Sequence, residues 1–600
     1  MQNTQGELGP QPVEAAPSSS QTDLIEKQVH DRNHSIDKES TLVESIRNAT
    51  PPRVLDEAEA QESRDRDIKM QILGDREMNE RELQGEEEKT EVEYPGLWRL
   101  ILITVGLCLA ILCLSLDNTI ITTAIPKITE QFNSLEDVGW YGSAYMLTTC
   151  VFTLSFGKLY TYYSTKLVFL IGLFIFEIGS LICGIAPNSV ALIIGRAVAG
   201  MGAAGLYSGA ILIIAQTVPL NKRPLYTGAL GGVFGIASVV GPLMGGAFTD
   251  HLTWRWCFYI NLPLGGLTFL FVLLLFKAPK PVKARSTLKN QILELDLLSM
   301  IFFFPAVVCL LLALQWGGSQ YAWSDGRIIA LFVLFGVLII MFIGMQGWQG
   351  DRATVPPRLL KNRNVSGAIV FSFCLFGAFL AAIYYIPIWF QAVKGVSATK
   401  SGIMNLPMVL GVTIMSLIAG VLTTVFGYYT PFMLLSPVIV TIGAGMLTTF
   451  KVDSGSPAWI GYQALFGLGV GMGSQQPIIL YQTVLSPVDV PTATAMGMFT
   501  QTLGGALFVS VAQNIFNNQL RGNMATLAPH VDVEKVVQAG ATMLRHVVSE
   551  VDLPGVLQAY SESITRTFFI AVAMGVMALF AALPIQWVSV RGKKIEMGAV

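Results

Sequence analysis

Apolar residues in this chain come in blocks of about 20, separated by short polar segments. A helix of about 20 residues spans the hydrocarbon core of a bilayer, which is about 30 Å thick. The pattern therefore predicts an all-α, polytopic membrane protein with fourteen transmembrane helices. The expected spans are residues 97–124, 138–158, 167–186, 190–217, 225–248, 258–276, 297–315, 328–347, 366–390, 402–424, 430–450, 458–484, 491–516 and 566–588.

The segment before the first span has a different composition. Residues 1–96 carry 23 acidic and 11 basic side chains, whereas the remainder carries 18 and 28. They are polar and almost free of aromatic residues, so they cannot bury enough apolar surface to offset the entropy lost on ordering. We expect a disordered acidic tail. The first apolar stretch begins near Leu97, far from Met1, so no cleavable signal peptide is expected.

Basic residues in the connections predict the orientation of the spans. If the amino terminus is cytoplasmic, the inside loops and the carboxyl-terminal tail carry sixteen Lys and Arg residues, and the short outside loops carry six. The positive-inside rule then places both termini in the cytoplasm. One outside segment, residues 517–565, is long and amphipathic, and we expect short helices over the outer mouth there. Plasma membrane is the favoured location, with the vacuolar membrane as the alternative.

Composition also argues against several classes of function. Hydrophobic residues make up 52% of the chain and charged residues 13%, which is too apolar for a soluble protein, and no nucleic-acid partner is expected. The seven cysteines lie in or beside apolar spans and are interpreted as small hydrophobic residues. The five histidines lie outside the spans, and we find no nucleophile–base pair, metal-ligand cluster or nucleotide-binding GxxxxGK[ST] loop. We therefore predict no enzyme activity, no cofactor and no metal.

The most distinctive stretch runs from Gly231 to Gly265 and reads GGVFGIASVVGPLMGGAFTD followed by HLTWRWCFYINLPLG. Small residues at helical spacing let two helices approach closely, and a proline in mid-span bends the helix. The residues that give this pattern are Gly235, Gly241, Pro242, Gly245 and Gly246. One interpretation is a purely structural packing face.

The combination of GxxxxxGPxxGG with WRWxFxINxPxG is more specific. It resembles the antiporter motif in the fifth span of the major facilitator superfamily, in its fourteen-span drug:proton antiporter branch. The resemblance implies the major facilitator fold, with two six-helix bundles at 97–276 and 366–588, two inserted helices in a linker at 277–365, and a cytoplasmic tail at 589–600. The similar loops Gly157–Lys166 and Gly420–Pro431 fit such a repeat.

Three ionisable side chains lie in the interior of predicted spans, away from the span ends, where a charge is costly and suggests a function. They are Asp117, Glu177 and Arg196. The segment Leu116–Pro126 resembles the family signature LDxTIVNVALP, whose Asp is implicated in proton or cation handling, and Arg196 fits the fourth-span pattern RxxxGxGAA. The resemblance implies proton coupling. A structural role is the alternative for all three, and Glu177 is a candidate either to pair with Arg196 or to contact a cationic cargo.

The loop Gly157–Lys166 matches the family pattern GxLADRxGRK only in part. Gly157, Leu159 and Lys166 remain, but the Asp and Arg that latch the two bundles in the family are replaced by Thr161 and Tyr162. We expect the closure of the bundles to depend more on the tyrosines of this loop. The tyrosine-rich version resembles the fungal toxin-efflux subgroup.

The second bundle supplies uncharged polar and aromatic side chains. Apolar pockets with a few hydrogen-bonding groups suit bulky, weakly polar ligands. The candidates for cargo binding are Tyr385, Trp389, Gln475, Gln482 and Gln501. The alternative for each of them is ordinary packing.

These observations predict a proton-coupled antiporter that exports amphipathic toxins, secondary metabolites or drugs by alternating access. Its partners would be the cargo, protons and the lipid bilayer, and we expect a monomer. Uptake of a siderophore or a basic amino acid is one alternative, and a membrane sensor with a transporter fold is another.

Overall fold

The computed structural model describes residues 94–591, except for 133, 135, 136, 280–294, 319, 320, 534, 537–543 and 546. Contacts divide the chain into Met1–Glu91 and Val92–Val600, and the second unit is described here. The acidic tail predicted at 1–96 lies outside the described residues except for Tyr94–Gly96, and so does most of the tail predicted at 589–600.

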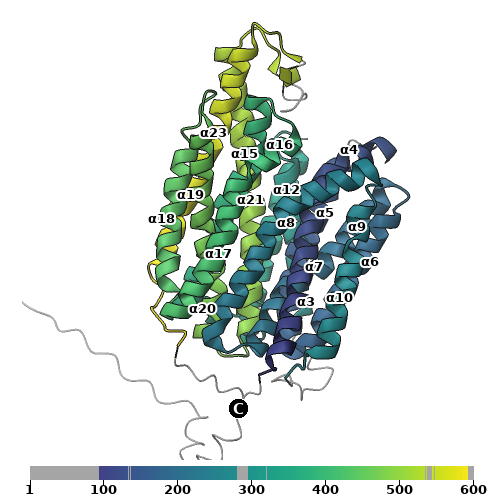
Figure 1. Ribbon diagram of the computed structural model, residues 1–600, viewed down its shortest axis with the longest axis vertical. Coiled ribbons are helices and arrows are strands. Elements are labelled where there is room, and N and C mark those ends of the chain that lie inside the picture. Colours follow the sequence, from purple (N-terminus) through teal and green to yellow (C-terminus); the bar gives the residue numbers. More distant parts are fainter. Residues whose placement is uncertain are drawn as a thin grey trace, which may run out of the picture. The chain divides into compact units, whose positions relative to one another are not determined.

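The long elements of the described residues are all helices, and they form two groups (Figure 1). The first group, called the first bundle below, ends before the undescribed residues 280–294. Its helices are α3 (Leu97–Thr119), α4 (Ile121–Phe132), α5 (Val138–Tyr162), α6 (Thr165–Ile185), α7 (Ser189–Thr217), α8 (Arg223–His251), α9 (Trp256–Tyr259) and α10 (Asn261–Leu275), with the 3-10 turn η2 at Leu220–Lys222.

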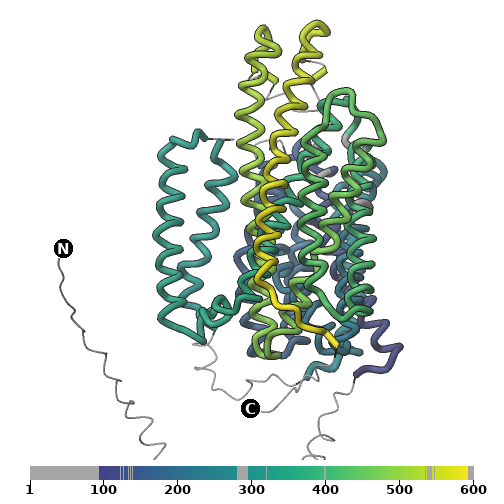
Figure 2. Tube along the Cα trace, turned by 90° about the vertical axis from the view of Figure 1, so that its left-hand side faces the viewer, coloured from purple at the N-terminus to yellow at the C-terminus, as the bar shows by residue number. Residues whose placement is uncertain are grey.

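The second bundle begins after a separate helix pair. The inserted helices are α12 (Leu297–Trp316) and α13 (Gly326–Gln349), followed by the 3-10 turn η3 (Gly350–Arg352) and the short helix α14 (Pro357–Lys361). Figure 2 shows this pair as a hairpin beside the two bundles. The second bundle consists of α15 (Arg363–Lys394), α16 (Ala398–Met404), α17 (Leu406–Phe426), α18 (Thr430–Leu447), α19 (Ser456–Ser474), α20 (Gln476–Val484), α21 (Val490–Leu527) and α23 (Leu553–Ala582).

Local sequence explains several helix boundaries. The side chain of Asn188 accepts a hydrogen bond from the Ala191 amide and caps α7. Gly395 and Gly427 end α15 and α17 with positive φ angles of 65° and 81°, which glycine adopts without steric cost. Pro477 lacks an amide hydrogen, so α19 cannot continue unbroken into α20.

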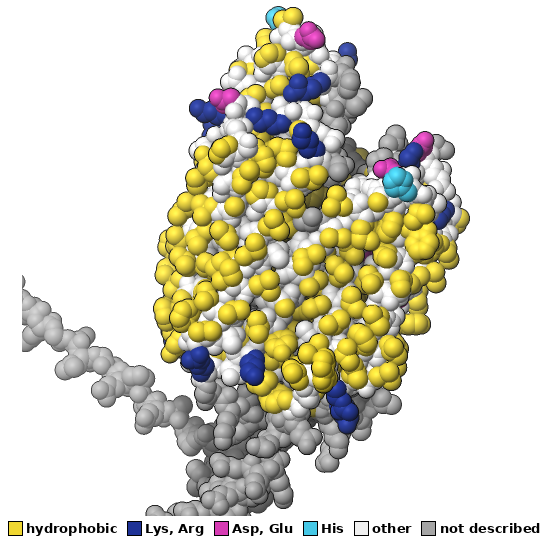
Figure 3. Space-filling view, in the orientation of Figure 1, with side chains coloured by type: hydrophobic (Ala, Val, Ile, Leu, Met, Phe, Trp, Pro, Cys, Tyr) yellow, Lys and Arg dark blue, Asp and Glu magenta, His cyan; other side chains and the backbone are white. Residues whose placement is uncertain are grey.

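Twelve helices of the described residues are long and apolar enough to cross a membrane. The two predicted spans that fall short correspond to α5 and to α19 with α20. The α5 sequence is rich in Thr, Ser and Tyr, and the other span is divided at Gln475. The count of fourteen therefore stays a prediction. In Figure 3, hydrophobic side chains cover the middle of the visible face and charged side chains lie near its two ends, as a bilayer requires.

The last two long helices run further than the apolar pattern indicated. The segment 517–565 was expected to be a long outside loop, but α21 continues to Leu527 and α23 begins at Leu553. Residues 517–527 contain no proline, so nothing stops the helix where the apolar pattern ends. Both helices project beyond the rest of the bundle on the side opposite to Leu97, which we call the far side (Figure 2). The side where α3 begins is called the termini side.

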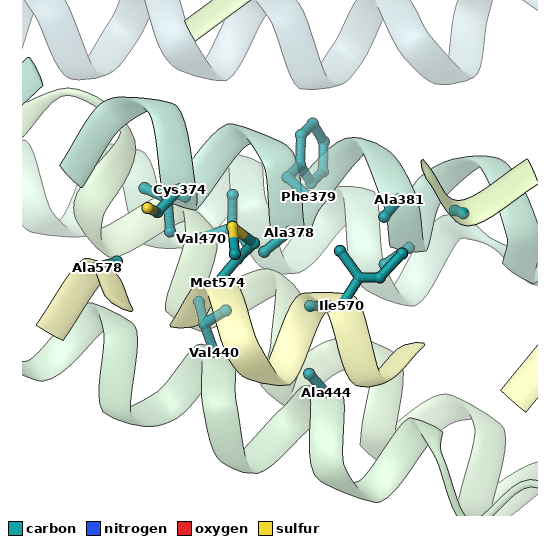
Figure 4. Close-up of a cluster of buried hydrophobic side chains, with 14 of the residues drawn as sticks. Cys374, Ala378, Phe379, Ala381, Val440, Ala444, Val470, Ile570, Met574 and Ala578 are labelled. Carbon is teal, nitrogen blue, oxygen red and sulfur yellow. The ribbon is translucent and has the colours of Figure 1, made fainter. Parts of the chain in front are cut away.

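Small side chains allow the helices of the second bundle to pack closely. Figure 4 shows Ala378 of α15, Ala444 of α18 and Met574 of α23 meeting in one apolar cluster. Next to Ala444, Gly443 of α18 lies against the backbone of Phe466 in α19, where an added Cβ would be 2.7 Å from the Phe466 Cα. Close packing of this kind holds helices together in a membrane, where water supplies little driving force.

We predict that Gly443→Ala lowers the thermal unfolding temperature of the purified protein in detergent. The new methyl group must push α18 away from α19, and overpacking of this kind costs about 1–3 kcal/mol. Gly445→Ala is the matched control, because a Cβ at Gly445 on the same helix meets nothing within 4 Å. Equal unfolding temperatures for the two variants would contradict this account of the packing.

Candidate functional site

Asp117 and Arg196 form an ion pair inside the first bundle. Asp117 lies near the end of α3, and Arg196 lies two turns into α7. Nη1 of Arg196 is 2.5 Å from Oδ2 of Asp117, and the two side chains are 1% and 0% exposed. The structure thus brings together two of the three residues that the sequence singled out for proton coupling.

Arg196 also has partners on α5. Its Nε donates to the carbonyl oxygen of Tyr141 at 2.8 Å, and its guanidinium lies 4.4 Å from the centre of the Tyr145 ring. Tyr141 is held in turn, because its hydroxyl hydrogen bonds with Ser189 at 2.8 Å. An arginine stays charged when buried, so fixed acceptors around it reduce the cost of burial. These contacts hold Arg196 independently of the state of Asp117.

Asn261 is a third member of this site, and the sequence interpretation missed it. Its Nδ2 donates to Oδ1 of Asp117 at 3.3 Å and to the hydroxyl of Ser180 at 3.2 Å. The residue is fully buried at the start of α10. The available signal was its position, since an amide within INLPLG stands at the start of an apolar helix. Asn261 links the ion pair to α6 and α10.

Glu177 of α6 lies apart from the ion pair. Neither of its carboxylate oxygens is solvent-exposed, and neither has a hydrogen-bond partner among the described residues. Of the alternatives considered for Glu177, the pairing with Arg196 is therefore not formed in this structure. The carboxylate instead faces Gly265 of α10, where an added Cβ would overlap it. A glycine at this position of INLPLG creates the space that Glu177 occupies.

The glycines of the antiporter motif lie along α8 and face different neighbours. Gly241 and Gly245 lie against α3 and α4 of the same bundle, where a Cβ would overlap Thr119 and Thr123. Gly246 faces open space, with nothing within 4 Å of an added Cβ. Pro242 lies inside the helix between these contacts. This half of the motif packs α8 within its own bundle.

The other half of α8 packs on α17 and so forms one of the contacts between the bundles. Gly235 lies against Thr413 of α17, and Gly231 lies against Ser416 of α17 and Gln475. The hydroxyl of Ser416 donates to the carbonyl of Gly228 at 3.4 Å. A single helix therefore packs on its own bundle through one set of glycines and on the second bundle through another.

The predicted loop Gly157–Lys166 is mostly helical, because α5 continues to Tyr162 and α6 begins at Thr165. The end of α5 contacts the second bundle near the start of α21. A Cβ on Gly157 would overlap that of Ala495, and the hydroxyls of Thr161 and Thr492 are 3.4 Å apart. Leu159 is partly buried and packs within the first bundle. Lys166 donates to the carbonyl of Leu273 at 2.6 Å, also within that bundle.

The tyrosines that we expected to contribute to closure lie in this part of the chain. The Tyr160 hydroxyl donates to the Gly205 carbonyl of its own bundle at 2.9 Å. The Tyr162 ring lies 5.9 Å from the Lys158 ammonium. The role of the tyrosines in closure stays a prediction, and the contact with α21 described above involves small residues and two threonine hydroxyls.

The cargo candidates of the second bundle lie in different environments. Tyr385 and Trp389 are buried in α15, where their polar atoms bond to Gln513 at 3.2 Å and Ser561 at 3.0 Å. Gln482 is buried, and its side-chain nitrogen and oxygen have no hydrogen-bond partner among the described residues. Gln501 is partly exposed on α21.

Within the described part of the chain, Gln475 is the candidate of this set that makes a hydrogen bond between the bundles. Its Nε2 donates to the hydroxyl of Tyr207 in α7 at 3.2 Å. Tyr207 was not singled out from the sequence, because a tyrosine in an apolar helix is ordinary. The pair lies where α7 of the first bundle meets the break between α19 and α20.

Comparison with known proteins identifies the family. The sequence profile described as Major Facilitator Superfamily matches residues 107–509. The chain belongs to the major facilitator superfamily. Two solved structures share its fold. The human organic anion transporter MFSD10 has a TM-score of 0.51 and 13% identity, and the match covers 80% of this chain and 100% of that one. The proton:xylose symporter XylE has a TM-score of 0.50 and 15% identity, and the match covers 80% of this chain and 94% of that one.

Several fungal transporters are similar in sequence to most of this chain. The MFS-type transporter astH of Aspergillus oryzae is 60% identical over 508 residues, covering 85% of this chain and 90% of that one. The efflux pump roqT of Penicillium rubens is 55% identical, covering 82% and 92%. The MFS-type efflux pump MFS1 of Arthroderma benhamiae is 54% identical, covering 86% and 96%. This chain is therefore a multi-pass membrane transporter of small molecules.

We predict that Gly245→Ala impairs this transporter more than Gly246→Ala does. A Cβ at Gly245 would lie 2.6 Å from the Ile120 carbonyl, so α8 must move away from α4, at a cost of about 1–3 kcal/mol. The neighbouring Gly246 has room for a methyl group. Thermal unfolding in detergent measures the difference, and equal effects of the two variants would refute the assignment of Gly245 to the α4 contact.

Asn261→Leu should destabilise the protein more than Ser180→Ala. The leucine removes a hydrogen-bond donor from a buried carboxylate, and an unsatisfied buried group costs about 1–3 kcal/mol, or more when charged. The alanine at Ser180 removes the second partner of the same amide and leaves its bond to Asp117 in place. A thermal unfolding temperature that falls further in Ser180→Ala would contradict this ranking.

Proposed function

We propose that this transporter exports amphipathic organic molecules, such as toxins, secondary metabolites or drugs, in exchange for protons. The similarity to roqT and MFS1, both described as efflux pumps, supports export. The observation that carries proton coupling is the fully buried carboxylate of Asp117 paired with Arg196. Ionisable groups inside membrane proteins commonly belong to proton or substrate pathways.

Asp117 is proposed as the residue that binds the proton. Protonation would remove its charge and with it the attraction to Arg196. Because Arg196 keeps the Tyr141 carbonyl and the Tyr145 ring, it would stay in place while the neutral Asp117 is released. Loss of the attraction between α3 and α7 would then change the relative stability of the inward-facing and outward-facing states.

Glu177 is the second candidate for proton coupling. Its buried carboxylate has no hydrogen-bond partner among the described residues, so a bound proton would lower the cost of keeping it in the bundle. In this proposal Asp117 carries the coupling and Glu177 a further proton site. The two assignments make different predictions for single variants.

Cargo would be bound between the bundles by alternating access. Gln475, with Gln482, Gln501, Tyr385 and Trp389 in the same bundle, supplies uncharged polar and aromatic groups for a weakly polar molecule. Both termini are proposed to be cytoplasmic and the plasma membrane to be the location, with the vacuolar membrane as alternative. The protein is proposed to act as a monomer. Each proton entering down a membrane potential contributes about 2.3 kcal/mol per 100 mV.

Asp117→Asn should abolish export driven by a pH gradient from proteoliposomes loaded with fluorescent amphipathic compounds. Exchange of labelled for unlabelled cargo without a gradient should persist, because the cargo site is not altered. The matched control is Asp250→Asn, which neutralises an exposed carboxylate near the end of α8. Removing one partner of a buried pair costs about 3–5 kcal/mol, so thermal unfolding of each variant must be measured alongside.

Other outcomes separate the alternatives. Gradient-driven export that survives in Asp117→Asn and disappears in Glu177→Gln would move the coupling to Glu177. Wild-type protein that exports cargo without any response to the gradient would contradict proton antiport. A folded protein that accumulates cargo in the opposite direction would point to uptake.

A further inference from the structure

Four residues make direct contact between the end of α5 and the start of α21. Thr161 and Thr492 have hydroxyl oxygens 3.4 Å apart. Gly157 and Ala495 pack closely through their nonpolar atoms. These four residues contribute little polar attraction to the seam between α5 and α21 on the termini side.

The inserted helix α12 lies over this seam and contacts both sides of it. The ring of Phe304 is 4.9 Å from that of Phe152 in α5, and the ring of Phe303 is 5.3 Å from that of Phe499 in α21. The Ser155 hydroxyl of α5 also lies 3.6 Å from the sulfur of Met300. Adjacent aromatic residues of one helix thus pack on different bundles.

The far-side end of the inserted pair also contacts both α5 and α21. Trp316, at the end of α12, packs edge-on against Trp140 of α5, with ring centres 6.2 Å apart. Trp323, in the connection to α13, donates to Oδ1 of Asn514 in α21 at 2.6 Å. The pair therefore contacts α5 and α21 at both ends.

On the termini side, Asp296 ties the chain that leaves α13 back to the start of α12. Its Oδ2 accepts from the amide and the hydroxyl of Thr354 at 2.8 and 2.9 Å. The side-chain amides of Gln346 and Gln349 donate to its carboxylate at 3.1 and 2.5 Å. Asp296 is 2% exposed and adopts a positive φ of 53°, a conformation that these contacts hold in place.

The segment held by Asp296 is attached to each bundle by a charged side chain. Lys158 of α5, 3% exposed, donates to the carbonyl of Arg352 at 2.9 Å. Arg358 of α14 makes two hydrogen bonds, of 2.9 and 2.5 Å, to the carboxylate of Asp489, which precedes α21. Asp351 lies 2.9 Å from the same guanidinium. One attachment reaches the first bundle and the other reaches the second.

We propose that the inserted pair and the segment after it, Asp296–Lys361, form a strap across the α5–α21 seam that holds the bundles together on the termini side. The strap adds one charged attachment to each bundle beside this seam. It would have to release at least one bundle whenever the seam opens. This inference rests on the alternating access of the proposed function, but not on which ion drives it.

The attachment through Arg358 is independent of pH in the physiological range. Hydrogen bonds to Asp489, together with Asp351, raise the pKa of Arg358 above its already high ordinary value. Because the pKa is raised in the folded protein, the stabilisation by the charged Arg358 side chain is complete at any pH below the ordinary pKa of arginine. It is lost only when the pH rises above that value. The guanidinium thus stays charged while the transporter works, so loss of its proton does not release this attachment.

Cysteine labelling at the seam tests the strap. Thr492→Cys places a thiol of similar size at the seam, on a residue 7% exposed in the closed arrangement. The rate of its reaction with a membrane-permeant maleimide, in membranes and without cargo or a pH gradient, reports how often the seam opens. The protein without this substitution gives the background from the seven native cysteines.

Added to this reporter, Arg358→Gln and Lys158→Met should each raise the labelling rate roughly threefold, as expected for losing one modest charged contact. Lys361→Gln is the matched control, since it removes an exposed positive charge from the same short helix, α14. The double exchange Arg358→Asp with Asp489→Arg should return the rate towards that of the reporter alone.

Two results would overturn the strap. Unchanged labelling in both Arg358→Gln and Lys158→Met would show that the attachments do not hold the seam. An equal rise in Lys361→Gln would show a general loosening instead of a specific contact. Because the readout needs no transport, a failure of proton antiport in the liposome experiment would leave this test intact.

Discussion

The buried charge of Arg196 is the constraint on which the first bundle depends. A guanidinium cannot lose its charge in a protein, so it must have compensation wherever it is buried. Here α3 supplies the carboxylate of Asp117, α5 supplies a carbonyl and an aromatic ring, and α10 steadies the carboxylate through Asn261. Three helices must therefore hold one relative position around α7, and a shift of any of them weakens the same site.

Glycines allow the remaining contacts to be as close as this site requires. On α8 one set of them faces α3 and α4, next to the segment that carries Asp117, and another faces α17 of the second bundle. A displacement of α3 relative to α8 therefore changes the packing of a helix, α8, that also contacts α17 of the second bundle. This arrangement gives a short physical route from the charge on Asp117 to the bundle interface without a long chain of side chains.

The sequence was sufficient for the class of fold and for singling out Asp117 and Arg196, but not for their pairing or for finer detail. Blocks of apolar residues predict helices because each block is set by the thickness of the membrane. Apolar blocks do not show where a helix ends outside the membrane, so the end of α21 and the start of α23 were missed. The apolar pattern is also weaker for spans that are divided or polar, such as α19 with α20.

Pairing between side chains depends on helix rotation, which a single sequence does not specify. Asp117 and Arg196 were both singled out without being paired, and one alternative for Glu177 was a pairing with Arg196, whereas its carboxylate faces Gly265. Asn261 was missed because one amide carries no pattern, although it completes the site. The loop between α5 and α6 showed which charges are absent, and only the structure showed that Arg358 and Lys158 provide charged contacts nearby.

The two kinds of charged contact differ in ways that suit different tasks. The Asp117–Arg196 pair is fully buried, and separating charged partners there is very costly, so a change in protonation is the practical way to alter it. The Arg358–Asp489 contact is different, because the Arg358 side chain is 50% exposed and water can replace its partner. A transporter that cycles needs a strong interaction that responds to its driving ion and weak ones that break and re-form. In this chain the first lies inside one bundle, and the second joins the proposed strap to the other bundle. In the proposed mechanism, proton binding and the closure of the seam therefore act at separate places.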